Sequence, residues 1–185
     1  MLIRPFIRIR YVGTENIPKK GRVILCSNHV SYFDPVALSM GVKRKIYYMA
    51  KSEFFTDYGF AVKCFFKICG VFPVKRNSSD TNAVHSAEEI LKNNRIVGIF
   101  PQGGISNDRK GFSPKAGAAM LAVKTATAVV PASIYFEGKI RLFTQITVRF
   151  GQVLIPSKDS SVKSARIFSK KIKEVILSQL EAEHQ

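Results

Sequence analysis

A histidine and an aspartate with four residues between them follow the apolar run 23–25, and Pro35 stands directly behind the aspartate. A tight turn of this length lets the carboxylate of Asp34 bond one imidazole nitrogen of His29. The other nitrogen then faces outward as a general base, and the carboxylate stabilises the cationic ring. A substrate that brings its own hydroxyl group needs no Ser or Cys nucleophile from the protein.

The same residues also have a purely structural interpretation. Asp34 could cap a helix that begins at Pro35, a residue suited to the first helical position, and His29 could simply fill the turn. Both interpretations place His29 above the carboxyl end of a strand, which is where open α/β sheets bind ligands. Cys26 is close enough to serve as a nucleophile, although a Cys at a strand end is more often a small core residue.

Segments with the apolar pattern of a strand alternate along the whole chain with segments that have the pattern of a helix. They predict an α/β fold, with a largely parallel central sheet flanked by helices, in a single domain over residues 1–185. Strands are expected at 6–12 (alternatively an interfacial arm), 22–27, 45–50, 70–74, 96–100, 129–135 and 146–151. Helices are expected at 35–40, 58–69, 81–94, 115–124 and about 160–182, the last capped by Asp159 or Ser160.

The charge balance restricts the kinds of partner. Lys and Arg total 29 against 13 Asp and Glu, a formal net charge of +16 that calls for an anionic partner. The aromatic residues are mostly Phe inside apolar runs, with no Trp, and no RNA-binding signature is present. This pattern disfavours nucleic acid and favours an anionic membrane surface, a phosphorylated substrate or an acidic carrier protein.

The three Cys have neither disulfide nor metal-ligand spacing, so a reduced chain without a metal is expected. No apolar run reaches the roughly 18 to 20 residues that span a bilayer, and no signal peptide is recognisable. We therefore expect a cytoplasmic protein, peripherally associated with the inner face of the cell membrane. Residues 1–12 and the apolar helix 58–69 would make that contact, unless the helix belongs to the core.

Three further segments carry motif-like patterns. Residues 70–76 form a strand that ends in Lys75 and Arg76, and residues 130–134 contain a Pro within an apolar strand. Residues 100–106 follow another strand and contain two adjacent glycines, whose backbone can approach an anion closely. Four segments resemble the motifs of the glycerolipid acyltransferases, the group that contains the lysophosphatidic acid acyltransferases. Residues 28–34 resemble the first motif, 70–76 the second, 100–106 the third and 130–134 the fourth. The motif-bearing region covers about residues 17–134.

The resemblance implies transfer of a fatty acyl group from acyl-CoA or acyl-carrier protein to the hydroxyl of lysophosphatidic acid, giving phosphatidic acid in phospholipid synthesis, with no cofactor beyond the co-substrate. His29 would be the general base and Asp34 its orienting partner. Arg76 would bind the acceptor's phosphate. The substrate-binding residues that the resemblance implies are Asn28, Lys75, Arg76, Gln102, Gly103 and Gly104.

The third motif departs from the family pattern Phe-Pro-Glu-Gly-Thr-Arg. Gln102 replaces the Glu, Gly104 the Thr and Ile105 the Arg. That Arg commonly helps to hold the acceptor's phosphate, and an isoleucine cannot imitate a guanidinium. Three cations downstream of the motif could replace this Arg: Arg109, Lys110 and Lys115. Alternatively, all three belong to a solvated basic loop.

The altered motif keeps two alternatives open. The same fold could acylate another acceptor, such as a lysophospholipid, glycerol phosphate or an amino-acid lipid. The chain could also be a non-catalytic lipid-binding protein of the membrane, although the retained His29 and Asp34 weigh against loss of catalysis.

Overall fold

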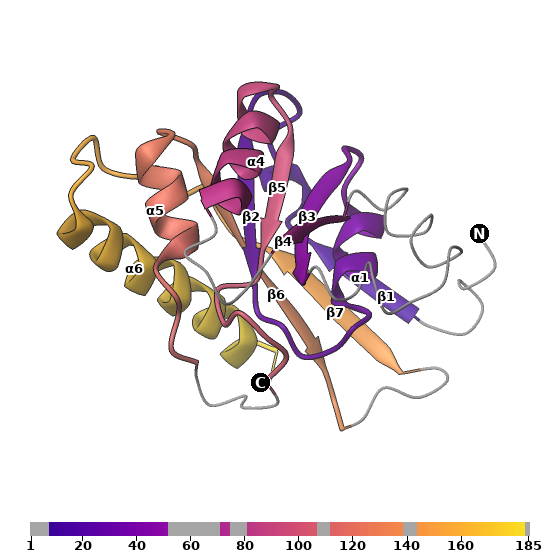
Figure 1. Ribbon diagram of the computed structural model, residues 1–185. Helices are drawn as coiled ribbons and strands as arrows, with labels where there is room; N and C mark the ends of the chain where they lie inside the picture. Colours follow the sequence, from indigo (N-terminus) through magenta and orange to yellow (C-terminus); the bar gives the residue numbers. More distant parts are fainter. Residues whose placement is uncertain (1–7, 52–70, 75–80, 107–111, 139–143, 184–185) are drawn as a thin grey trace.

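The computed structural model describes residues 8–51, 71–74, 81–106, 112–138 and 144–183 (Figure 1). In these residues seven strands form one sheet in the order β1-β7-β6-β2-β5-β3-β4. The strands are β1 (Arg8–Val12), β2 (Val23–Ser27), β3 (Ile46–Lys51), β4 (Val71–Val74), β5 (Ile96–Ile99), β6 (Val129–Phe136) and β7 (Gln145–Phe150).

Five neighbouring strands of this sheet run in the same direction. Strands β6, β2, β5, β3 and β4 are parallel to one another, whereas β7 is antiparallel to β6 and β1 is parallel to β7. The segments that follow β2 and β5 therefore emerge at one edge, where the parallel strands have their carboxyl ends. The predicted α/β fold with a largely parallel sheet is confirmed.

Helices cover both faces of the sheet. The described helices are η1 (Thr14–Asn16), α1 (Asp34–Gly41), α4 (Thr81–Lys92), α5 (Gly117–Lys124) and α6 (Val162–Glu181). Helices α4, α5 and α6 lie on one side of the sheet and bury one apolar cluster against it, whereas α1 contributes to a second cluster on the other side (Figure 1).

Strand β2 is buried along its whole length between these two clusters. Ile24 and Cys26 belong to the cluster under α4, α5 and α6, and Val23 and Leu25 belong to the opposite one. This alternation is the two-residue period of a strand, and a continuous apolar run is typical of a strand covered on both faces. The chain that leaves β2 therefore starts from a rigid, central position.

Two helix caps differ from the prediction. Phe33 precedes α1, and Asp34 is the first helical residue with its carboxylate turned back to the preceding turn. At α6 the capping side chain is Ser161, which accepts a bond from the amide of Ser164 at 3.1 Å. Asp159 instead accepts bonds from Ser161, so the expected cap at Asp159 or Ser160 was wrong by one or two residues.

Several predicted features lie outside the described residues. These are residues 1–7 of the N-terminal arm, the helix expected at 58–69, and the second-motif cations Lys75 and Arg76. Within the described part of the chain, no helix has the length and apolar character needed to cross a membrane.

A glycine in β5 makes room for an aromatic ring of β3. Gly98 lies opposite Tyr48 in the strand register, and a Cβ atom on Gly98 would fall 2.3 Å from the Tyr48 ring and 2.9 Å from Ile46. Tyr48 is buried and its ring stacks on Phe100, with 5.9 Å between the ring centroids. The absent side chain at position 98 therefore sets the position of an aromatic pair at the carboxyl end of β5.

We predict that Gly98→Ala lowers the free energy of unfolding by about 1–3 kcal/mol, because the added methyl group must displace the buried Tyr48 ring. Urea denaturation measures this change. Gly117→Ala is the matched control, since nothing lies within 4 Å of a Cβ atom there and alanine favours the helix. Equal stability of the two variants would contradict this packing.

Candidate active site

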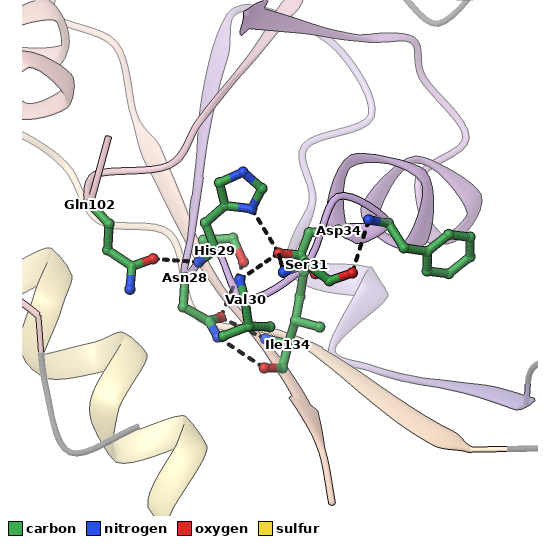
Figure 2. Close-up of polar contacts among 9 residues, drawn as sticks. Asn28, His29, Val30, Ser31, Asp34, Gln102 and Ile134 are labelled. Atoms are coloured by element: carbon green, nitrogen blue, oxygen red, sulfur yellow. Dashed lines mark hydrogen bonds and ion pairs between the residues drawn. The ribbon is translucent and has the colours of Figure 1, made fainter. Parts of the chain in front are cut away.

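One oxygen of Asp34 receives three hydrogen bonds. The Oδ2 atom lies 2.8 Å from His29 Nδ1, 2.7 Å from the amide of Val30 and 2.8 Å from the amide of Ser31 (Figure 2). Backbone amides only donate, so this oxygen is an acceptor, and a carboxylate also accepts from the imidazole. The network therefore assigns the hydrogen of His29 to Nδ1 and leaves the lone pair on Nε2.

The exposures of the two side chains fit different roles. The Asp34 side chain is only 2% exposed, whereas that of His29 is 15% exposed. The turn between them is fixed further by the Phe33 amide, which donates to the Ser31 hydroxyl at 3.1 Å. Asp34 thus orients a ring that solvent can still reach, and its carboxylate makes no cap hydrogen bond to α1.

Asn28 extends the pairing between β2 and β6 by one residue. The regular register ends with Ser27 opposite Ala132. Beyond it, the side-chain amide of Asn28 donates to the carbonyl of Ile134 at 2.9 Å and accepts from its amide at 2.7 Å. Asn28 was expected to contact substrate, but it is 3% exposed and its side chain holds the backbone next to His29.

The segment after β5 holds His29 from the other side. The side chain of Gln102 accepts a hydrogen bond from the His29 amide, and the Ser106 amide donates to the His29 carbonyl at 2.9 Å. The Phe100 ring stacks on the imidazole, with centroids 4.1 Å apart and an interplanar angle of 17°. The third-motif segment therefore contacts both backbone polar groups and one ring face of His29.

Lys115 lies against the glycine turn of this segment. Gly103 has a φ of +74°, and a Cβ atom there would lie 2.9 Å, 2.8 Å and 2.7 Å from Cδ, Cε and Nζ of Lys115. The Lys115 amide donates to the carbonyl of Pro101 at 2.8 Å, which fixes the approach of its backbone. The structure thus brings a predicted substrate-binding lysine to the third motif, whereas Arg109 and Lys110 lie outside the described residues.

Cys26 is unsuited to act as the nucleophile. It has no exposed surface, and burial raises the pKa of its thiol from 9.0 to about 12. The thiol therefore stays protonated and inaccessible at neutral pH, which is the state of a core residue. In the described part of the chain, no three His, Cys, Asp or Glu side chains gather closely enough to hold a metal ion.

The assembled groups can move a proton at the carboxyl edge of the sheet. A histidine with its tautomer fixed by a buried carboxylate can take a proton from a hydroxyl group that attacks an acyl carbon. Sequence patterns predicted the His29 and Asp34 pair but missed the ring contact of Phe100. The available signal was position, since Phe100 directly follows β5 and the polar turn follows the adjacent strand β2.

The sequence matches the Acyltransferase family over residues 8–135. The chain belongs to this family. The matched region contains the whole network around His29, including Asp34, Gln102 and Lys115, and it ends inside β6. This acyltransferase therefore has its candidate site within the part of the chain that defines the family.

Curated proteins and a solved structure show the same relationship. The chain is 25% identical over 178 residues to a 1-acyl-sn-glycerol-3-phosphate acyltransferase of Bacillus subtilis, covering 90% of this chain and 87% of that protein. It is 32% identical over 133 residues to the protein of that name in Borreliella burgdorferi, covering 70% of this chain and 52% of that protein. The crystal structure of the 1-acyl-sn-glycerophosphate acyltransferase PlsC of Thermotoga maritima matches with a TM-score of 0.73 and 27% identity, covering 97% and 74%.

Proposed function

We propose that this acyltransferase transfers a fatty acyl group from an acyl-CoA or acyl-carrier-protein thioester to the hydroxyl of lysophosphatidic acid, giving phosphatidic acid for phospholipid synthesis. The observation that carries the proposal is the 2.8 Å bond between Asp34 Oδ2 and His29 Nδ1, which leaves Nε2 as the base. The names of the Bacillus, Borreliella and Thermotoga proteins support lysophosphatidic acid as the acceptor.

The proposed reaction needs only His29 to move the proton. Nε2 takes the proton from the acceptor hydroxyl while that oxygen forms a bond to the thioester carbonyl carbon. The tetrahedral intermediate then collapses, the carbon–sulfur bond breaks, and the imidazolium returns the proton to the departing thiolate. Asp34 stabilises the cationic ring between these two steps.

The other motif residues have two proposed tasks. Asn28 and Gln102 hold the backbone of His29 and so keep Nε2 in place. The second-motif cations Lys75 and Arg76 bind the acceptor's phosphate together with the third-motif segment.

A second acceptor class is favoured by one observation. Ile105, which is 38% exposed, stands where the family pattern has an arginine. The same chemistry could therefore serve a different lysophospholipid, glycerol phosphate or an amino-acid lipid. The intact bond network around His29 weighs against a non-catalytic lipid-binding protein, because nothing in mere lipid binding requires a fixed histidine tautomer.

Acceptor-dependent thiol release tests the proposal. With acyl-CoA and lysophosphatidic acid in detergent micelles, we expect release by the native chain and a decrease of about 100- to 10,000-fold in His29→Ala, because the general base is lost. His85→Ala, on the exposed side of α4, should retain the full rate.

A folded His29→Ala variant with an undiminished rate would refute the role of this histidine. If the native chain releases thiol only with another acceptor, or only from acyl-carrier protein, the second acceptor class or that donor replaces the first proposal.

We further propose that the carboxyl edge of the sheet faces the inner leaflet of the cell membrane. Tyr32, in the turn between His29 and Asp34, is 78% exposed, and Ile105 is exposed in the segment that holds His29. Tyrosine is favoured where one end of a side chain is apolar and the other is wet, and the net charge of +16 favours anionic lipid.

A single tryptophan at the site edge tests this orientation, because the chain has no Trp of its own. With anionic vesicles that contain brominated lipids, we expect Ile105→Trp to shift its emission to the blue and to be quenched. Ile155→Trp is the matched control, since Ile155 is 71% exposed but follows Leu154, which pairs with Val129 at the amino end of β6. Equal quenching at both positions, or none at position 105 in vesicle-bound protein, would contradict the orientation.

A further inference from the structure

Two charges of the third motif are missing together in this chain. The family pattern has a glutamate and an arginine where this chain has the neutral residues Gln102 and Ile105. The oxygen of Gln102 accepts the His29 amide bond, and a glutamate oxygen could accept the same bond. The amide therefore preserves the support of His29 while it removes a negative charge from the turn.

Among the residues that the structure describes, Lys115 places a cation beside this turn. Its stem runs along Gly103, with Cδ, Cε and Nζ successively 2.9, 2.8 and 2.7 Å from the position of an ideal Cβ atom. Any side chain at position 103 would collide with this stem, and the φ of +74° also favours glycine there. The Lys115 side chain is exposed, and its ammonium lies against Gly103, the residue that follows Gln102 in the turn.

One amide of the turn is less available to a ligand than the sequence indicates. The Gly103 amide donates to the Phe100 carbonyl at 2.9 Å, so it closes the turn and is not directed at a ligand. A glycine-rich turn can bind an anion through its free backbone amides. Because the Gly103 amide is already bonded, an anion at this turn would depend more on a side-chain cation.

We propose that Lys115 binds the phosphate monoester of the acceptor in place of the missing arginine, and that the neutral Gln102 leaves the lysine's charge available for this task. A carboxylate at position 102 would lie one residue from Gly103 and compete with the phosphate for the ammonium. This inference rests on the proposed function for the identity of the acceptor. The phosphates of CoA have the same chemistry, and the experiment separates the two sources.

The test compares Lys115→Met with the native chain in acyl transfer from acyl-CoA to lysophosphatidic acid. Methionine keeps an unbranched stem along Gly103 and removes the terminal ammonium group. We expect KM for lysophosphatidic acid to rise about 10- to 100-fold, while KM for acyl-CoA and kcat stay within about two-fold. Ile105→Arg added to Lys115→Met should recover most of the loss, because it restores a cation to the same segment.

Three results would overturn the proposal. An unchanged KM for lysophosphatidic acid would remove Lys115 from the phosphate site. A rise confined to KM for acyl-CoA would assign the lysine to the donor. A fall in kcat with a lower unfolding midpoint, without recovery by Ile105→Arg, would show that Lys115 acts only through its packing on Gly103.

Direct binding separates this proposal from the proposed function. Calorimetric titration of lysophosphatidic acid into His29→Ala, with and without Lys115→Met, needs no turnover. If the native chain transfers no acyl group, the proposed function fails, but weaker binding in the Lys115→Met protein still supports the phosphate site. Equal binding by the two proteins, or none by either, overturns it.

Discussion

The site depends on a single carboxylate oxygen. Asp34 Oδ2 accepts from the imidazole of His29 and from the amides of Val30 and Ser31, in a side chain that is 2% exposed. A buried carboxylate is costly unless hydrogen bonds compensate its lost hydration. The conformation of the turn, the start of α1 and the orientation of the imidazole are therefore coupled, because loss of this one carboxylate would leave all three donors without their acceptor.

The parallel sheet brings distant parts of the chain together around His29. His29 leaves the central strand β2, the side chain of Asn28 binds Ile134 in β6, and the segment after β5 supplies Gln102 and Phe100. Because β6, β2 and β5 are adjacent and parallel, their carboxyl ends lie side by side at one edge of the sheet. The fold thus fixes the backbone of His29 on both sides while a part of its side chain stays exposed.

Local patterns predicted the described strands and helices and the pairing of His29 with Asp34, because strand periodicity and the spacing of these two residues lie within short segments. Contacts that join separate segments could not be predicted in this way. Asn28 and Ile134 are 106 residues apart, and their pairing follows from strand order and register, which periodicity leaves open. The lysine on Gly103 likewise depends on the path of a loop, so charge alone did not distinguish Lys115 from Arg109 and Lys110.

The tautomer of His29 is the most direct test of the account. Nitrogen-15 NMR of the imidazole rings, with His29 identified by its loss in His29→Ala, reports which ring nitrogen carries the proton at mildly alkaline pH. The bond to Asp34 predicts a protonated Nδ1 and an unprotonated Nε2, and Asp34→Ala should let the proton redistribute towards Nε2. A native His29 protonated at Nε2, with a bare Nδ1, would contradict the orientation of the base and the mechanism built on it.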